Sequence, residues 1–400
     1  MDSGSVAWML AASALVLFMT PGLAFFYGGL VRGKNAISTV MYSFVAIGVV
    51  SVVWVLWGYS LAFGEGGDFI GNFDFLGFKD VASESDEGIP PMLFAIFQMM
   101  FAIITPALIT GAIAERFKFT TYLIFLVAWV TFVYAPIAHW VWASDGWLFE
   151  LGALDFAGGT VVHINAGVAA VAAAWLVGKR RGVDRGVEPH NVPFVILGAS
   201  ILWFGWFGFN AGSGLAADGL AVSAFLVTNT AAATALVVWL ILGHIHTGKM
   251  SAVGAATGAV AGLVAITPAA GFVGPMGSIA IGLGAGVLTF YAVRIRHKFG
   301  FDDALEVMAV HGIGGIWGAL ATGIFAVGGI GLIDGDAKVL GYNAVAVLST
   351  IAYSFVVTFV ILKILDVIPG LGLRADDAAE DAGLDVSLHG ERAYVGDGAD

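Results

Sequence analysis

The chain has 400 residues, of which 59% are hydrophobic and 12% are charged, whereas a soluble domain usually carries about 25% charged residues. The net charge of −12 argues against binding to nucleic acid. The absence of cysteine excludes disulfides, cysteine-bound metal and thiol catalysis.

Apolar runs near the length of a bilayer crossing recur along the whole chain, which predicts an all-α polytopic membrane protein. The runs are continuous and do not alternate, so they do not favour a β-barrel. We place eleven transmembrane helices, at residues 7–31, 36–62, 91–113, 119–138, 158–178, 191–210, 219–243, 251–269, 277–293, 305–328 and 341–366.

The distribution of positive charge predicts the orientation. Of the 17 Lys and Arg residues, 15 end or follow odd-numbered spans, and only Lys79 and Lys338 lie in the other set of loops. Because positive charge accumulates on the cytoplasmic side, we expect the N-terminus outside and the C-terminus in the cytoplasm. The chain is thus expected to be a multi-pass protein of the cell membrane.

A basic loop over residues 178–191 divides the chain into two halves of five spans, about 7–178 and 191–328, followed by an eleventh helix at about 341–366. An odd number of spans in each half means that the halves insert with opposite topology, and such inverted repeats are common in transporters. Residues 1–370 are expected to form the membrane domain, and 371–400 an acidic cytoplasmic tail.

Two histidines lie well inside predicted spans, in matching surroundings. His163 lies within Asp155–Gly167 (DFAGGTVVHINAG), and His311 within Val310–Gly315 (VHGIGG). A titratable group inside a bilayer is costly and suggests a functional site. A lone buried histidine is more often a hydrogen-bonded packing residue, but two in opposed halves are rarer. Such a pair, sharing one proton, would suit an apolar path for a small neutral polar molecule and penalise a bare ion.

Asp155 precedes a Gly-Gly pair at the head of the fifth span. It is as readily a helix N-cap as an acid whose charge favours a cation in a vestibule. The residues alone leave both interpretations open.

Aromatic residues gather near the expected outer ends of two spans. Phe97 and Phe101 are four residues apart and share a helix face with Ile104. Trp142 is expected in the outer loop after the fourth span. Such rings hold a small cation by cation–π attraction, worth about 0.5–2 kcal/mol each, although a lipid-interface aromatic belt is the alternative.

Phe209 and Ser213 are also four residues apart, near the outer end of the sixth span. The Ser213 hydroxyl is positioned to accept a hydrogen bond from a cation held by the rings. Spacing alone does not separate this role from packing.

Several motifs, in order along residues 7–395, resemble the ammonium transporter family (Amt/Mep/Rh). Besides the two histidine motifs they are FYGGLVRGKN at Phe26–Asn35, GAIAERFKF at Gly111–Phe119, GWFGFNAGS at Gly205–Ser213 and ITPAAGFVG at Ile266–Gly274. The resemblance implies eleven spans and a homotrimer with one pore in each subunit. Trp142 favours the Amt branch, since Rh-type members typically replace it.

The resemblance also implies roles for individual residues. It implies an outer ammonium site at Phe97, Phe101, Trp142 and Ser213, a gate formed by Phe101 and Phe209, twin pore histidines at His163 and His311, a vestibule acid at Asp155, and further pore-proximal residues at Trp206 and Thr267. The implied mechanism is deprotonation of ammonium near the gate and passage of ammonia past the histidines. No metal or other cofactor is expected.

The tail has two interpretations. Its acidic composition, without apolar periodicity, favours a disordered segment. GLDVSLHGERAY at Gly383–Tyr394, however, resembles a family motif that docks on the cytoplasmic face and takes part in regulation by the PII signalling protein.

Two other classes of function were weighed. An ammonium sensor often carries an appended signalling domain, whereas only about 30 residues follow the last span here. An intramembrane enzyme would need a second acid or a metal-ligand cluster beside the histidines, and the spans contain none. Transport is therefore the preferred prediction.

Overall fold

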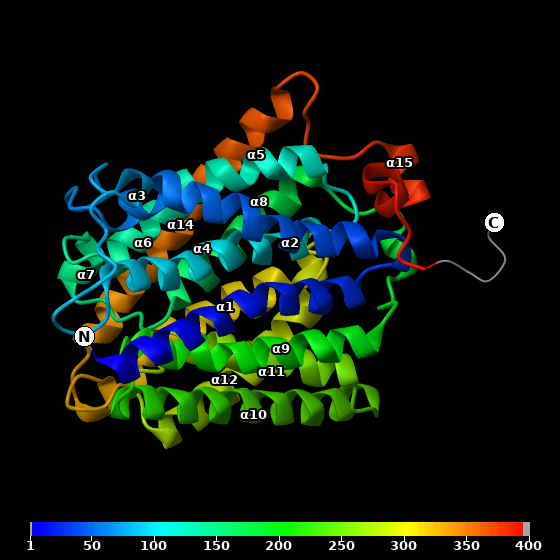
Figure 1. Ribbon diagram of the computed structural model, residues 1–400. Coiled ribbons are helices and arrows are strands. Elements are labelled where there is room, and N and C mark those ends of the chain that lie inside the picture. The colour runs from blue at the N-terminus through cyan, green and yellow to red at the C-terminus, as the bar shows by residue number, and fades with distance from the viewer. Residues whose placement is uncertain (1, 395–400) are drawn as a thin grey trace.

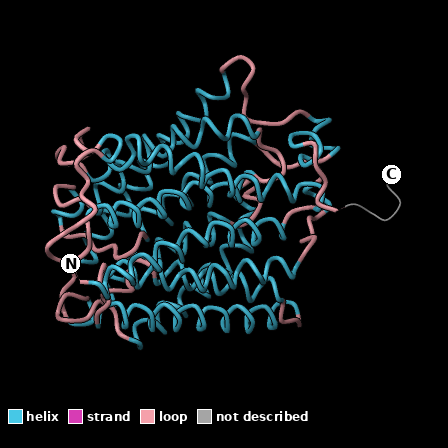
Figure 2. Tube along the Cα trace, viewed as in Figure 1, coloured by secondary structure: helices cyan, strands magenta, loops and turns pink. Residues whose placement is uncertain are grey.

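The computed structural model describes residues 2–394, and within that range it is built from helices and loops with no strand (Figures 1 and 2). The long helices lie side by side in one bundle (Figure 1). The chain begins at one end of this bundle, which we call the N-terminal face. The last short helix, α15 (Asp377–Ala382), lies at the opposite end, the C-terminal face.

Each predicted span corresponds to one helix or to a chain of helical segments. They are α1 (Ser3–Leu30); α2 (Ala36–Val53), η2 (Trp54–Gly58) and α3 (Tyr59–Phe63); α4 (Pro91–Ile113); α5 (Phe119–Trp129), η4 (Val130–Tyr134) and α6 (Ala135–Trp142); η5 (Gly159–Ile164) and α8 (Asn165–Val177); α9 (Val192–Ala211); α10 (Gly219–Thr247); α11 (Ala252–Ile266); α12 (Pro275–Ile295); η9 (Met308–Ile313) and α13 (Gly314–Phe325); and α14 (Lys338–Val367). Short helical segments in the loops include α7 (Trp147–Leu151) and η7 (Gly212–Gly214).

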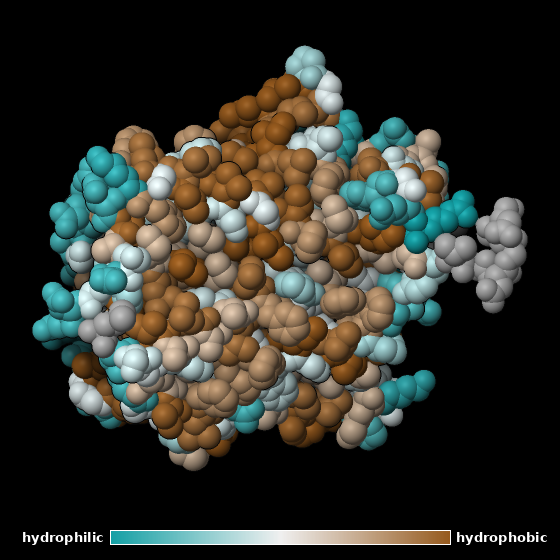
Figure 3. Space-filling model, viewed as in Figure 1, coloured by the Kyte–Doolittle hydropathy of each residue, from teal (hydrophilic) through white to brown (hydrophobic). Residues whose placement is uncertain are grey.

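The predicted fold class is confirmed. Within the described range, 10 helical segments are long and apolar enough to cross a membrane, and the remaining predicted span contains the shorter apolar helix α11, Ala252–Ile266. Hydrophobic residues cover the middle of the bundle, and hydrophilic residues gather at its two ends (Figure 3). This distribution matches a bilayer crossed along the helix axes.

One boundary prediction was wrong in a way that matters for the site. The fourth span was expected to end at residue 138, with Trp142 in the loop beyond it. Instead α6 continues to Trp142, its last residue. Trp142 is therefore held by a helix end.

Small residues let the helices approach closely. A Cβ added to Gly22 of α1 would lie 2.6 Å from the Ile201 side chain of α9, and one added to Gly198 would lie 2.2 Å from the Phe26 backbone nitrogen. Only glycine fits such contacts, which allow the first helices of the two halves to pack backbone to backbone.

The C-terminal tail is ordered as far as Tyr394, so the disorder suggested by its composition is wrong for residues 371–394; the final residues 395–400 lie outside the described range. Asp385 accepts hydrogen bonds from the backbone N–H groups of Ile37 (3.0 Å) and Ser38 (2.8 Å), in the first turn of α2. This carboxylate therefore caps a membrane helix from a distant part of the chain.

Ion pairs also hold the tail to the C-terminal face. Arg181, from the basic loop that divides the halves, pairs with Asp377 and Asp381 at 2.7 and 2.9 Å. The ammonium group of Lys34 donates to the carbonyl oxygens of Glu380 and Asp381. The acidic composition of the tail thus complements the basic loops on which it lies.

Candidate functional site

The two predicted histidines meet in the interior of the bundle. Nδ1 of His163 and Nδ1 of His311 are 3.2 Å apart, and the side chains are 1% and 3% exposed. A hydrogen bond between two such nitrogens needs one proton, donated by one ring and accepted by the other. The sequence placed both residues inside spans, but their contact is a finding of the structure.

Both histidines lie on π-helical turns that begin their spans. His163 is the fifth residue of η5, and His311 is the fourth residue of η9. Gly167 of α8 faces the second turn so closely that an added Cβ would lie 2.3 Å from the backbone nitrogen of Gly312. The glycines of the two motifs therefore allow the close approach that brings the imidazoles together.

Asp155 fixes the start of the first of these turns. Its carboxylate accepts hydrogen bonds from four backbone N–H groups, those of Gly158, Gly159, Thr160 and Val161, at 2.6–3.3 Å. These bonds satisfy donors that a helix start leaves unpaired, so the N-cap interpretation holds. Whether its charge also favours a cation in the vestibule stays a prediction.

Asp303 does the same for the second turn, and sequence reasoning missed it. Its carboxylate accepts from the N–H groups of Val307 (3.1 Å) and Met308 (2.7 Å). Burial raises the pKa of Asp303 despite these hydrogen bonds. The signal was present in the sequence, since Asp155 precedes His163 by eight residues and Asp303 precedes His311 by eight.

A cavity of about 240 Å³ on the N-terminal side contains all four residues of the expected outer site: Phe97, Phe101, Trp142 and Ser213. The Phe101 ring lies 4.9 Å from that of Phe97 and 5.8 Å from that of Trp142, centroid to centroid. Ser213 donates its hydroxyl hydrogen to the Phe209 carbonyl oxygen at 2.8 Å, so its oxygen retains lone pairs for an incoming donor. We call this cavity the vestibule.

Trp142 is held in the wall of the vestibule by the Asp155 main chain. Its indole N–H donates to the Asp155 carbonyl oxygen at 2.9 Å. The same residue therefore positions one ring of the vestibule and the helical turn of His163. Further vestibule residues that spacing did not single out are Phe94, Gln98, Phe149, Phe156 and Leu215.

Phe101 and Phe209 separate the vestibule from the histidines. Their ring centroids are 4.2 Å apart, and each side chain is 1% exposed. Phe101 lines the vestibule, whereas Phe209 lines the next cavity and lies 6.0 Å from the His163 ring. The two rings therefore lie between the two cavities, where the sequence predicted a gate.

The inner cavity of about 10 Å³ is lined by Ile104, Phe209, both histidines and other side chains that are almost all apolar. That volume is about one probe sphere, enough for one water-sized molecule. Trp206 forms another part of its lining and stacks on His163 at 5.4 Å between centroids. The Trp206 indole N–H donates to Thr267 Oγ1 at 2.8 Å, which holds Thr267 next to a residue that lines the inner cavity.

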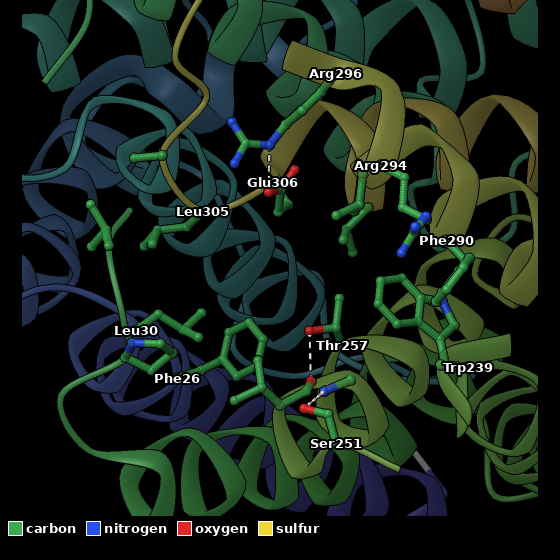
Figure 4. A pocket seen from close by; sticks show the side chains of 18 of the residues that line it. Phe26, Leu30, Trp239, Ser251, Thr257, Phe290, Arg294, Arg296, Leu305 and Glu306 are labelled. Carbon is green, nitrogen blue, oxygen red and sulfur yellow. Dashed lines mark hydrogen bonds and ion pairs between the residues drawn. The ribbon is translucent and has the colours of Figure 1, made fainter. Parts of the chain in front are cut away.

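His311 also lines a larger cavity of about 500 Å³ toward the C-terminal face, which we call the exit cavity (Figure 4). Its walls carry Lys249, Arg294 and Arg296, and Glu306 points toward Arg296 and forms an ion pair with it (Figure 4). The lining of the successive cavities thus changes from aromatic side chains in the vestibule to charged side chains in the exit cavity.

Beside this cavity lies a buried ion network. Arg180 binds Asp302 through Nε at 2.8 Å and lies 3.5 Å from Glu115, which also pairs with Arg32. Burial alone would raise the pKa of Asp302, but the hydrogen bonds and charge of Arg180 outweigh it and hold that pKa at about 2. This network ties the basic loop to the segment that carries Asp303. Among the described residues, no group of three or more His, Asp or Glu side chains is arranged to hold a metal ion.

Comparison with known proteins identifies the family. Residues 7–394 match the model of the Ammonium Transporter Family. An ammonium transporter of Bacillus subtilis is 49% identical over 404 aligned residues, covering 98% of this chain and 99% of that protein. The Ammonium transporter Amt1 of Archaeoglobus fulgidus is 47% identical, covering 99% of this chain and 100% of its own.

Comparison with solved structures points to the same family. The crystal structure of Saccharomyces cerevisiae Mep2 superposes with a TM-score of 0.89 at 38% identity, covering 94% of this chain and 88% of that one. A structure described as a Sensor Amt Protein also reaches 0.89, at 35% identity, covering 96% and 98%. Four described features, namely the helical membrane bundle, the aromatic vestibule, the ring pair and the histidine pair, lie within the matched length. The chain therefore belongs to the ammonium transporter family, as its motifs indicated, and is a membrane transporter of ammonium and not an enzyme.

Proposed function

We propose that ammonium is recognised in the vestibule, loses its proton near Phe101 and Phe209, and crosses the constriction at His163 and His311 as ammonia. The observation that carries this proposal is the row of contacts from Trp142 through Phe101 and Phe209 to the histidines. It joins an outer cavity to an exit cavity through a space of about 10 Å³.

The energetics support deprotonation. Moving an intact ion into a medium of low dielectric constant costs about 20 kcal/mol in an idealised Born picture. The lining of the inner cavity offers no carboxylate to offset that cost. A neutral ammonia molecule avoids most of it and still finds a hydrogen-bond donor and an acceptor in the imidazole pair.

The vestibule accounts for selectivity at entry. Its rings attract any small cation. The Ser213 oxygen, however, adds a hydrogen bond that ammonium donates and that potassium, which has no hydrogen, does not. We further propose that the N-terminal face is outside the cell and the C-terminal face cytoplasmic, since the basic loops and the tail lie there.

We test the pathway with purified protein in liposomes on a supported membrane. An ammonium jump is expected to give a current or an internal alkalinisation that His163→Ala and His311→Ala abolish and that potassium does not elicit. His244→Ala, which removes an exposed histidine of α10, is the control and should behave as wild type. Current means that charge crosses, and alkalinisation alone means net ammonia flux. If the wild type gives neither a current nor an alkalinisation, the proposal is contradicted.

A sensor is the second candidate function. The similarity to the Sensor Amt Protein and the ordered tail, which docks on the basic loops, favour it. It predicts ammonium binding with little flux and a tail whose docking changes with ammonium. Hydrogen exchange at Ile37 and Ser38, with and without ammonium, separates the two candidates.

We also propose the assembly and partners that the family resemblance implies. The chain forms a homotrimer of membrane domains (residues 1–370, two inverted halves and α14), and the docked tail and exit cavity receive a PII signalling protein. The matching Asp and His positions of η5 and η9 support the inverted halves. Native mass spectrometry of the full chain, alone and with a PII protein, tests both assemblies.

A further inference from the structure

A third buried histidine, outside the pore, makes two contacts that a neutral ring cannot satisfy. His139 of α6 is fully buried. Its Nδ1 lies 3.0 Å from the carbonyl oxygen of Ala62, and its Nε2 lies 2.6 Å from that of Gly67. A carbonyl oxygen only accepts, and neutral imidazole carries one N–H. The neutral ring would therefore hold a lone pair against a carbonyl oxygen, whereas an imidazolium donates to both.

A counter-charge is in place. Asp145 Oδ1 lies 3.6 Å from His139 Nε2, and Asp145 Oδ2 accepts from the Gly67 N–H at 3.1 Å. A buried charge persists when it is paired and hydrogen-bonded. No other acid in the described chain lies within ion-pair distance of His139. The titratable residues on the segments that contact α6 are Tyr59, Glu65, Asp68, Tyr134, Glu150, Asp155, His163 and Tyr353.

The neighbouring contacts show what this cation holds. The carbonyl oxygen of Phe69 accepts a hydrogen bond from the indole N–H of Trp140 at 2.8 Å. The carbonyl oxygen of Asp68 accepts one from the backbone N–H of Trp147 at 3.1 Å. One loop of the N-terminal face is thus fastened at three successive residues, Gly67 and Phe69 to the end of α6 and Asp68 to the first residue of α7. Trp142, three residues after His139, is the last residue of that helix and a wall of the vestibule.

We propose that His139 is held as an imidazolium paired with Asp145, and that this cation is a positioning residue that fixes the end of α6 and so places the Trp142 ring over the vestibule. The charge state stands on the geometry of His139 alone. Only its consequence for ammonium binding rests on the proposed function.

His190 provides a matched control within the same chain. Its Nδ1 lies 2.8 Å from the Val31 carbonyl oxygen, and its Nε2 lies 3.1 Å from the Tyr394 hydroxyl. A hydroxyl can donate as well as accept, so a neutral imidazole satisfies both contacts. The two histidines therefore differ in the chemistry of the second partner, and His139 is also more deeply buried and faces Asp145.

The charge is measured by ¹⁵N solid-state NMR of the full chain, labelled at histidine, in liposomes at pH 8. An ordinary histidine is about 3% charged at that pH. We expect one imidazolium signal in the wild type and in His190→Gln that is absent in His139→Gln. A wild type with no imidazolium signal, or a signal that survives His139→Gln, overturns the proposal.

Asp145→Asn is the second variant, and it keeps the test decisive if His139→Gln does not fold. It leaves the imidazole in place and removes only the counter-charge, so the imidazolium signal should be lost at pH 8. An unchanged signal contradicts the pairing.

The positioning role is measured by transport. In His139→Gln we expect the half-saturating ammonium concentration to rise about five-fold or more, with the maximal rate per folded protein retained. A merely structural residue would lower the amount of folded protein and leave half-saturation unchanged, and that result overturns the positioning role. His190→Gln should change neither value. A wild type without transport contradicts the proposed function, while the NMR result still decides the charge of His139.

Discussion

The two histidine-bearing turns use the same local device in different surroundings. Asp155, just before η5, accepts hydrogen bonds from four backbone N–H groups at the start of that turn and lies behind an aromatic vestibule. Asp303, before η9, accepts hydrogen bonds from two backbone N–H groups at the start of that turn and lies beside a network of buried ion pairs. An acid that holds a helical turn thus appears twice, and each half surrounds it differently. The two halves therefore contribute nearly equivalent turns to the constriction, whereas the vestibule on one side and the exit cavity on the other are lined differently.

The sharpest asymmetry is at the contact between the halves. An added Cβ on Gly167 would lie 2.3 Å from the Gly312 backbone nitrogen, whereas one on Gly312 finds its nearest atom at 3.7 Å. We expect Gly167→Ala to separate the histidines, destabilise the protein by about 3 kcal/mol and abolish transport. Gly312→Ala should be tolerated. Thermal unfolding and ammonium flux of the two variants measure the contrast, and equal behaviour would contradict it.

The second contrast is between the two acids. Asp155→Ala strands up to four buried N–H groups, each costing about 1–3 kcal/mol, so we expect a loss of at least about 3 kcal/mol of unfolding free energy. Asp303→Ala strands two and should cost less, about 2 kcal/mol. Asp155→Asn keeps one acceptor oxygen and should fall between wild type and Asp155→Ala. Denaturant titration in detergent gives the order, and a larger cost for Asp303→Ala would refute it.

A third, smaller effect concerns the surroundings of the two rings. The His163 ring lies against Trp206, whose N–H is bound by Thr267, whereas the His311 ring borders the exit cavity. Thr267→Val leaves that buried N–H without its acceptor, which should cost about 1–3 kcal/mol. Thr267→Ser retains the hydroxyl and serves as the control. If both variants are equally stable, the hydrogen bond does not hold Trp206.

The last effect is the pH dependence that Asp302, on the segment before η9, gives to stability. Folding lowers the pKa of Asp302 to about 2, from about 3.9 in an unfolded chain. Its contribution to stability is therefore complete above about pH 4 and is lost as the pH falls toward 2. Asp302→Asn should remove this part of the acid dependence. Melting temperatures of both proteins between pH 5 and pH 2 check it, and parallel curves would count against the Arg180–Asp302 pair.

Much of the fold could be predicted because bilayer crossings leave long apolar runs in the sequence. The vestibule residues Phe97 and Phe101 follow from helical spacing. Trp142 was assigned to the correct region but not to a helix, since neither its place at the end of α6 nor its bond to Asp155 is visible in a hydropathy pattern.

The features that sequence reasoning missed are contacts between distant residues. His139 lies one residue beyond the fourth predicted span, and the two carbonyl oxygens that surround it come from another helix and from a loop. Composition alone favoured disorder for the tail, because its acidic residues find partners only in the folded basic loops. Asp303 could have been predicted, because it precedes His311 by eight residues, just as Asp155 precedes His163 by eight.

The hydrogen bond between the two Nδ1 atoms makes the two remaining ring nitrogens of the constriction unlike each other. When both rings are neutral, the ring that donates through Nδ1 has a bare Nε2, and the ring that accepts carries its hydrogen on Nε2. Whichever ring donates, the pair presents one donor and one acceptor away from the shared bond. A molecule that both gives and takes a hydrogen bond finds a complement in either arrangement, whereas an alkali ion can use only half of it.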